Sequence, residues 1–401
     1  MKLPLQGIRV IEFAHMVMGP TCGLILADLG AEVIKVEPVE GDNTRRLTGS
    51  GAGFFPAFNR NKKSLAIDIR DAQAKAAVLR LVAGADIVSE NFRPGAMEAL
   101  GLGEAALRAL RPDLIYVSHK GFLAGPYAQR TALDEVVQMM AGLAYMTGPP
   151  GRPLRAGASV NDIMGGMFGA IGAIAALYRR DADRLPGEAD ARGEAMHRID
   201  SGLFENCAFL VAQHMMQAAV TGKPAAPMPA RVAAWGIYDV FTLADRTQLF
   251  LAVVSDTQWK SFCAALERPD WFADPRLTTN PLRVAAREWL MPQVAAALGA
   301  LTQAEVTALA TRAGLPWAPI TRPDELFDDP HLNAAGGLAP MTLPSGTATA
   351  VPLLPLSIDG ERLPLRQSPP AVGQHTRALL ADAGLSAAQI DALIARGAAA
   401  G

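Results

Sequence analysis

Asp162 is the residue in this sequence best placed to do covalent chemistry. It lies in Gly157–Gly166, where small and polar residues precede an apolar stretch that we predict to be helical. A carboxylate at a helix N-terminus can cap the helix, because the helix dipole and the first backbone amides favour a negative charge. The same placement would let the carboxylate attack an acyl group. The pattern alone leaves both roles open. It also leaves open whether the nearby Gly165 and Gly169 make room for a ligand or for a packed helix.

Short segments beside the predicted strands combine cations with polar or aromatic groups. They are Asn59–Ser64, Asn91–Gly95 and Ser118–Phe122. Such groups at strand ends can contact the phosphates or the ring of an anionic ligand. Each segment also fits a solvated turn, because charged runs usually face water. From the residues alone we expect an anionic small-molecule ligand and no named reaction.

The composition is that of a folded protein with ample material for a core. The chain has 401 residues, of which 50% are hydrophobic and 19% charged, which excludes global disorder. Lys and Arg number 37 against 39 Asp and Glu, a net charge of −2, so no nucleic-acid partner is expected. Cys22, Cys207 and Cys263 are far apart and no His pair has helical metal-ligand spacing, so no metal site is expected.

The start of the chain has no apolar signal-peptide core. The longest uncharged run, Ile163–Tyr178, is shorter than the roughly 18–20 residues of a membrane span. We therefore expect a cytoplasmic protein that does not use a membrane as a partner.

The first third of the chain alternates strand-like and helix-like segments. The expected strands are Ile8–Phe13, Glu32–Glu37, Ser64–Ile69, Asp86–Ser89 and Leu114–Ser118. The expected helices include Asp71–Val82, Leu133–Met146, Val160–Arg179 and Arg198–Ala219. Repeated strand–helix units predict the α/β class, with a Rossmann-like, doubly wound parallel sheet whose ligands gather at the carboxyl ends of the strands.

After the Pro-rich segment Thr221–Pro229 the residue pattern no longer repeats strand–helix units, which predicts a second, smaller α+β domain. We predict that this domain begins with a hairpin of Ile237–Leu243 and Gln248–Val254 and that helices follow. We expect residues 1–220 to form the N-terminal part of a large domain and residues 221–330 the small domain. Residues 331–401 would return to the large domain.

An ordered set of motifs runs through nearly the whole chain. It comprises Leu5–Phe13 with Gly19-Pro20, Gly30–Glu37 with Gly41-Asp42 and Arg45, Asn59–Ser64, Glu90–Gly95, Gly125–Tyr127, the Asp134 region, Ala175–Arg179 and Gly373–Thr376. The set resembles the family III coenzyme A transferases, the group of formyl-CoA transferase and carnitine CoA-transferase. No single motif decides the resemblance, but their order along the chain is specific.

The resemblance implies a CoA-transferase with Asp162 at the position of the family's nucleophile. Asp162 would attack the donor thioester to form a mixed anhydride and then an aspartyl-CoA thioester. Coenzyme A thioester is then a substrate, and no tightly bound cofactor is implied. The resemblance also implies an interlocked homodimer, in which each chain passes through a ring made by the other.

The contacts to coenzyme A carry over position by position. Val17 and Met18 fall at the thiol end, Ile67 and Arg70 beside the phosphates, Asn91, Phe92 and Arg93 on the nucleotide side, and Thr131 and Asp134 near the pantetheine arm. Two features of formyl-CoA transferase are missing. Pro38 stands where that enzyme has an arginine, and the Gly-rich substrate loop of that enzyme is absent from this sequence, so formate–oxalate exchange is not expected.

The segments around Lys120 and Thr131 look most like members that move CoA between C4 and C5 dicarboxylates. Succinate, mesaconate, citramalate, itaconate and glutarate are the candidates, with transfer between two molecules or within one mesaconyl-CoA. A second carboxylate needs cations, which His119, Lys120, Arg45 or Arg155 could supply.

Two other functions stay open at this point. An α-methylacyl-CoA racemase-like isomerase is disfavoured because Leu133 stands where that enzyme carries a catalytic His. A non-catalytic CoA-binding subunit is disfavoured because Asp162 is retained.

Overall fold

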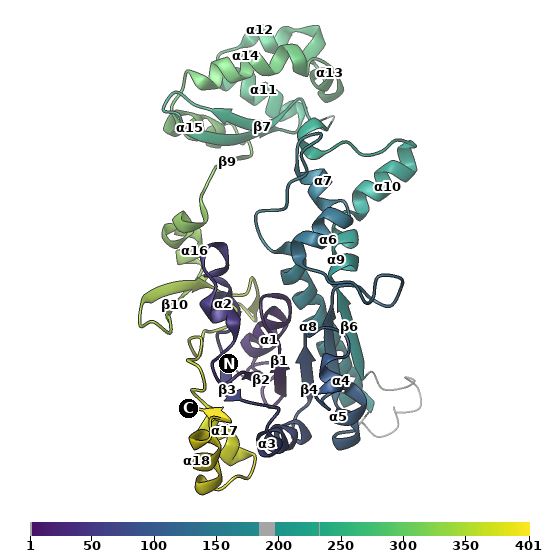
Figure 1. Ribbon diagram of the computed structural model, residues 1–401. Helices are drawn as coiled ribbons and strands as arrows, with labels where there is room; N and C mark the ends of the chain where they lie inside the picture. Colours follow the sequence, from purple (N-terminus) through teal and green to yellow (C-terminus); the bar gives the residue numbers. More distant parts are fainter. Residues whose placement is uncertain (1, 184–196, 232) are drawn as a thin grey trace. The chain divides into compact units, whose positions relative to one another are not determined.

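The computed structural model describes residues 2–183, 197–231 and 233–401 (Figure 1). The chain divides into two compact units. The first unit consists of Met1–Pro229 and Pro330–Gly401, and the second of Ala230–Asp329. The first unit therefore holds both ends of the chain, and the second is a continuous insert.

The first unit is built on a sheet with the strand order β14-β3-β2-β1-β4-β5-β6. The strands are β1 (Arg9–Phe13), β2 (Glu32–Glu37), β3 (Lys62–Ile67), β4 (Ile87–Glu90), β5 (Ile115–Lys120), β6 (Arg198–Gly202) and β14 (Ala399–Ala400). Neighbouring strands run parallel except β14, which is antiparallel to β3. The α/β class with a mainly parallel sheet is thus confirmed. The strand order reverses at β1, which places a ligand crevice at its carboxyl end.

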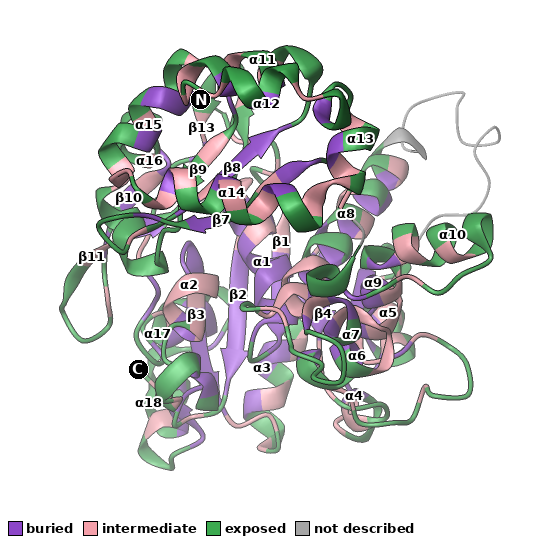
Figure 2. Ribbon diagram, turned by 90° about the horizontal axis from the view of Figure 1, so that it is seen from above, coloured by how far each residue is buried: buried purple, intermediate pink, exposed green. Residues whose placement is uncertain are grey.

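Helices cover both faces of this sheet, because side chains on a strand point alternately to opposite faces. Val10 of β1 packs with α1 (Met18–Asp28) and α8 (Val160–Asp183) on one face. Ile11, the next residue, belongs to the core on the other face. That second core is completed by α3 (Ala72–Ala83), α5 (Glu104–Leu110), α17 (Thr376–Asp382) and α18 (Ala387–Ala395). The central strands are accordingly buried along their length (Figure 2).

Glycines bring α1 and α8 into close contact. A Cβ atom on Gly166 would lie 2.5 Å from the Met18 carbonyl oxygen, and one on Gly165 would lie 2.3 Å from Met18 Cε. A Cβ on Gly169 would lie 2.4 Å from the imidazole of His119. These glycines therefore serve helix packing, which was one of the two roles that the sequence left open.

Two predicted helices are wrong in part. Leu133–Met146 is two helices, α6 (Asp134–Met140) and α7 (Leu143–Thr147), because Gly142 between them has a φ of +86°. The first five residues of Arg198–Ala219 form strand β6, which pairs with β5. Only the remainder is helical, as α9 (Leu203–Leu210) and α10 (Ala212–Thr221).

The second unit has its own sheet and its own core. The strands are β7 (Ile237–Thr242), β8 (Gln248–Val253) and β9 (Trp317–Pro319), all antiparallel to their neighbours. The hairpin expected from the sequence is confirmed. The helices are α11 (Asp256–Ala265), α12 (Pro269–Ala273), α13 (Asn280–Ala285), α14 (Arg287–Gly299) and α15 (Gln303–Arg312). Trp259 and Trp271 are stacked in the core of this unit.

Shorter elements complete the described residues. They are α2 (Phe54–Phe58), α4 (Ala96–Ala99), α16 (Pro330–Ala334), β10 (Leu338–Thr342), β11 (Ala348–Pro352), β12 (Ser357–Ile358) and β13 (Glu361–Arg362). By length and composition alone, Val160–Asp181 of α8 could cross a membrane, although the uncharged run within it is shorter. The glycine face of this helix is packed on α1, as in the core helix of a globular protein.

Candidate active site

Asp162 lies in the first turn of α8 but does not cap its own helix. The cap comes from α6, where Asp134 Oδ1 accepts hydrogen bonds from the backbone amides of Asn161 (2.8 Å) and Asp162 (3.1 Å). Among the residues that the structure describes, none donates a hydrogen bond to the Asp162 carboxylate. Of the two roles considered for Asp162, this arrangement favours the chemical one.

The electrostatic surroundings of Asp162 disfavour its charged form. Burial, and to a smaller extent the negative charge of Asp134, raise the pKa of this carboxyl to about 7, while Arg155 acts in the opposite direction. Arg155 Nη2 lies 4.0 Å from Asp134 Oδ2, and its Nη1 lies 3.7 Å from Glu135 Oε2. Three carboxyl groups, those of Asp134, Glu135 and Asp162, therefore surround one guanidinium, that of Arg155.

Gln138 connects this carboxylate pair to the segment that carries Arg155. Its side-chain nitrogen donates to Asp134 Oδ2 (2.5 Å), and its side-chain oxygen accepts from the backbone amide of Ala156 (2.8 Å). Gln138 is fully buried. Sequence reasoning missed Gln138 and expected Asp134 only near the pantetheine arm, because a cap supplied by another helix leaves no local sequence signal.

Met18 brings the start of α1 next to Asp162. Its side chain packs on Gly165, which lies one helical turn after Asp162. Val17 and Met18 are both buried. Met18, one of the two residues predicted at the thiol end, therefore contacts α8 one helical turn after the predicted nucleophile.

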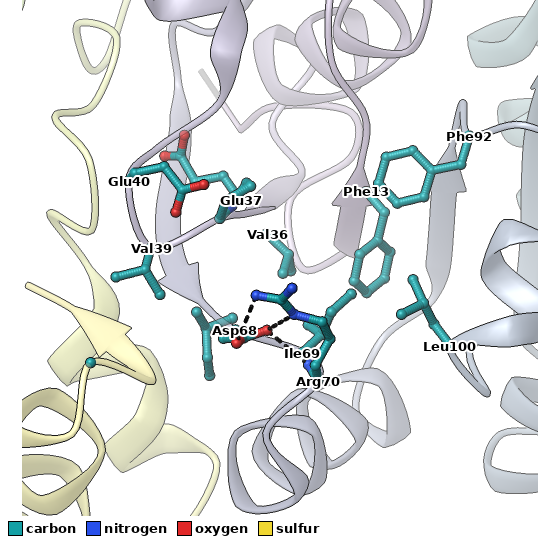
Figure 3. A pocket seen from close by; sticks show the side chains of 13 residues that line it. Phe13, Val36, Glu37, Val39, Glu40, Asp68, Ile69, Arg70, Phe92 and Leu100 are labelled. Atoms are coloured by element: carbon teal, nitrogen blue, oxygen red, sulfur yellow. Dashed lines mark hydrogen bonds and ion pairs between the residues drawn. The ribbon is translucent and has the colours of Figure 1, made fainter.

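A pocket of about 470 Å³ opens at the carboxyl ends of β1, β2 and β3 (Figure 3). It brings together three residues predicted to contact coenzyme A, Ile67, Arg70 and Phe92. Arg70 is exposed and its Nε lies 2.8 Å from Asp68 Oδ1. Pro38, at the position of the arginine noted above, also lines the pocket.

The other predicted nucleotide contacts lie elsewhere. Asn91 uses its side chain to hold the backbone of His15, accepting from its amide (3.0 Å) and donating to its carbonyl (2.8 Å). Arg93 is exposed and does not line the pocket. The structure therefore does not bring these two side chains to the pocket. Thr131, predicted near the pantetheine arm, is exposed and does not line this pocket either.

The four predicted cations differ in their availability. His119 is buried against Ser89, and burial lowers its pKa to about 3, so it is neutral and cannot attract a carboxylate. Arg45 is committed to both oxygens of Glu37 and stacks on Phe55. These two predictions are corrected by the structure.

Lys120 and Arg155 remain as cations for a ligand. Lys120 Nζ is 2.9 Å from Glu90 Oε1 and its side chain is 19% exposed. The Arg155 side chain is 40% exposed and lies beside the Asp134–Asp162 pair. Of the four, Arg155 combines exposure with proximity to Asp162.

Cys22, Cys207 and Cys263 are free, buried thiols. Within the described ranges, no group of three His, Cys, Asp or Glu side chains could hold a metal ion. The Asp162 region offers carboxylates, amides and an exposed guanidinium, and a separate set of residues forms the pocket at the carboxyl ends of the strands.

The family model for CoA-transferase family III matches residues 5–376. The chain belongs to this family. The resemblance noted in the sequence and the assignment as an enzyme of the CoA-transferase class are confirmed. Family III CoA-transferases use CoA thioesters as substrates, which agrees with the pocket and the carboxylate described above.

Relatives with named activities cover almost the whole family III chain. It is 32% identical over 394 residues to the succinate–glutarate CoA-transferase of Agrobacterium fabrum, covering 95% of this chain and 96% of that protein. It is also 32% identical over 394 residues to the succinyl-CoA–D-citramalate CoA-transferase of Chloroflexus aurantiacus, covering 94% of each. A crystal structure of a CAIB/BAIF family protein from Brucella suis matches with a TM-score of 0.83 and 31% identity, covering 96% of this chain and 100% of that one.

Proposed function

We propose that this family III CoA-transferase moves coenzyme A between C4 or C5 dicarboxylic acids, with Asp162 as the covalent nucleophile. The observation that carries the proposal is the Asp162 carboxylate, which is largely buried at the start of α8 while Asp134 caps the helix in its place. The named activities of the Agrobacterium and Chloroflexus relatives support the substrate class.

The proposed reaction has two matched halves. Asp162 attacks the thioester carbonyl carbon of the donor, the C–S bond breaks, and a mixed anhydride and the CoA thiolate result. The thiolate attacks the aspartyl carbonyl carbon, which releases the donor acid and leaves an aspartyl-CoA thioester. The acceptor carboxylate then attacks the aspartyl-CoA thioester, which forms a second mixed anhydride and releases the CoA thiolate. The thiolate attacks the acyl carbonyl carbon of the acceptor, which gives the new CoA ester and regenerates the Asp162 carboxylate. Water takes no part, so the thioester free energy is retained.

The surroundings of Asp162 suit its role in this sequence. Burial and the neighbouring Asp134 disfavour the charged carboxylate, and attack on the thioester removes that charge. The buried Val17–Met18 segment of the adjoining loop and helix excludes water on one side. Low water access protects an anhydride from hydrolysis.

Arg155 is proposed to bind the distal carboxylate of the acid. It is the exposed cation beside Asp162, and a guanidinium matches the geometry of a carboxylate with two parallel hydrogen bonds. Coenzyme A would place its nucleotide in the pocket that holds Arg70 and Phe92. Transfer could be between two molecules or within one.

We also propose that the chain works as an interlocked homodimer. Large apolar side chains are exposed along α8, α9 and α10: Met167, Ile171, Tyr178, Phe209, Met216 and Val220. Helix α10 contains no buried residue, so its apolar side chains have no cover in the described chain. A second copy would bury this surface. A cytoplasmic location stays the prediction made from the sequence.

Mass spectrometry of CoA esters tests the proposal. Purified protein is mixed with succinyl-CoA and a pool of C4–C6 dicarboxylic acids, beside Asp162→Ala and the exposed control Glu288→Gln. A new CoA ester that Glu288→Gln retains and Asp162→Ala loses is expected. Deuterium exchange at the α carbon of a branched acyl-CoA, without any new ester, would instead support the isomerase.

A further inference from the structure

The loop Ala14–Val17 connects the two parts of the proposed site. It leaves the carboxyl end of β1, where the strand order reverses, and enters α1 at Met18. On the pocket side, the ring of His15 in this loop is 5.8 Å from the ring of Phe92. On the other side, Met18 packs on Gly165, one turn from Asp162. The loop therefore has the pocket at one end and the helix that carries Asp162 at the other.

The backbone of the loop is strained and is held by side chains from other segments. Met16 has a φ of +64°, a left-handed conformation that residues with side chains adopt only when their surroundings hold them. The anchors are Lys35 Nζ on the Ala14 carbonyl (2.5 Å), Asn91 on the amide and carbonyl of His15 (3.0 and 2.8 Å), and Thr44 Oγ1 on the Met16 amide (2.9 Å). Each anchor comes from a segment distant in sequence.

Two of these anchors belong to one buried polar chain. Thr44 Oγ1 donates to Asp42 Oδ1 (2.8 Å), and Asp42 Oδ2 lies 2.8 Å from Lys35 Nζ. All three residues are at most 4% exposed. Because the ionised Asp42 can only accept, the Thr44 proton points to it and a Thr44 lone pair is left for the Met16 amide. The orientation of the Thr44 hydroxyl is thereby fixed.

We propose that Thr44 is a positioning residue of CoA transfer, whose hydroxyl fixes the Met16 backbone so that the bound thioester meets Asp162. The inference rests on the proposed function, since it takes Asp162 as the nucleophile. Misplacing reacting atoms by about 1 Å can cost roughly 100-fold in rate. Neither Thr44 nor Met16 lines the nucleotide pocket, so we expect the affinity for coenzyme A to depend mainly on other residues.

Substitutions at Thr44 test this role. Thr44→Val keeps the shape and removes the hydroxyl, Thr44→Ser keeps the hydroxyl, and Thr48→Val is a control at a nearby exposed threonine. We expect Thr44→Val to lower kcat by about 10- to 100-fold and to change the Kd of coenzyme A by less than threefold. Thr44→Ser and Thr48→Val should remain within threefold of the wild type. Thr44→Ala replaces the valine variant if that one does not fold.

Hydrogen–deuterium exchange separates this inference from the proposed substrate class. The peptide containing Met16 should exchange faster in Thr44→Val than in Thr44→Ser, with coenzyme A bound to both. If the wild type moves CoA to none of the acids, the substrate class fails, and this exchange difference together with the Kd values still tests the loop. Equal kcat in the valine and serine variants, or equal exchange of the Met16 peptide, would overturn the positioning role.

Discussion

Asp134 Oδ1 lies 3.1 Å from the backbone nitrogen of Asp162 and accepts its hydrogen bond. One carboxylate therefore caps the helix that carries the other. The capping carboxylate also places a like charge beside Asp162, which raises the pKa of Asp162 after the larger effect of burial. A single contact thus both frees the Asp162 carboxylate from capping and tunes its ionisation.

The rate of transfer should depend on the ionisation of Asp162. Because the carboxylate is the attacking form, kcat/KM should rise with pH and level off above about pH 7, the pKa of this carboxyl. Asp134→Asn keeps an oxygen for the cap and removes the charge, so the midpoint should move to lower pH. Arg155→Met removes a cation that lowers this pKa, so the midpoint should move to higher pH. Shifts in the same direction for both variants would contradict this account.

The stability of the protein should also depend on the ionisation of Asp162. The pKa of Asp162 is about 7 in the fold against a usual value of 3.8, so the unfolded state loses this proton first as the pH rises. The free energy of unfolding of the wild type therefore falls as the pH rises from about 4 to about 7. Asp162→Asn has no titrating group at this position, so its free energy of unfolding should not show this decrease. The two pKa values differ by about 3, which corresponds to roughly 4 kcal/mol at pH 8. Asp162→Asn should therefore melt like the wild type below pH 4 and several degrees higher than the wild type at pH 8. Thermal denaturation below pH 4 and at pH 8 measures the Tm of both proteins. A Tm of Asp162→Asn below that of the wild type at pH 8 would contradict this prediction.

Local sequence patterns predicted the strands well because their signal is the spacing of apolar residues. Glu32–Glu37 is a strand with the predicted bounds, and Asp71 caps α3 through the amides of Gln73 and Ala74. The pattern failed at β6, whose sequence Arg198–Gly202 has little apolar character. It becomes a strand because the edge of β5 offers it backbone partners, which is a tertiary cause.

Sequence patterns single out residues that carry chemistry by themselves and miss contacts between residues that meet across the fold. Asp162 stands out by its type and position, and the family resemblance points to Arg70. The neutrality of His119 follows from its burial under α8, and the cap from Asp134 follows from the packing of α6 on α8. No pattern local to either residue encodes these contacts.

Arg155 should govern the affinity for the acid. Arg155→Ala is expected to raise the KM of a dicarboxylate about tenfold, since a charge-assisted hydrogen bond contributes roughly 1.5–3 kcal/mol, and to leave the KM of the CoA donor nearly unchanged. Arg152→Ala, an exposed arginine in the same loop, is the matched control. Steady-state kinetics, with each substrate varied in turn, measures the KM of the dicarboxylate and the KM of the CoA donor separately. If Arg155→Ala and Lys120→Ala both left the dicarboxylate kinetics unchanged, neither cation would bind the distal carboxylate.

Arg70 should contribute to binding of coenzyme A. It lines the pocket, and among the residues that the structure describes its ion pair is the exposed contact with Asp68, so a phosphate can compete for it (Figure 3). Arg70→Ala should raise the Kd of coenzyme A about 3- to 10-fold, more at low salt than at high salt. Arg93→Ala should change it little, because Arg93 does not line the pocket. Calorimetric titration of both variants with coenzyme A measures these Kd values. A larger effect of Arg93→Ala than of Arg70→Ala would contradict the phosphate contact proposed for Arg70.

The most direct test of the central claim follows oxygen atoms through a turnover. An acceptor acid with both carboxylate oxygens labelled with oxygen-18 attacks the aspartyl-CoA thioester and leaves one labelled oxygen on Asp162 when its CoA ester departs. After turnover with succinyl-CoA, the peptide containing Asp162 should therefore be about 2 or 4 mass units heavier, and the product ester should hold one labelled acyl oxygen. An unlabelled Asp162 peptide alongside a labelled product ester would contradict nucleophilic attack by Asp162.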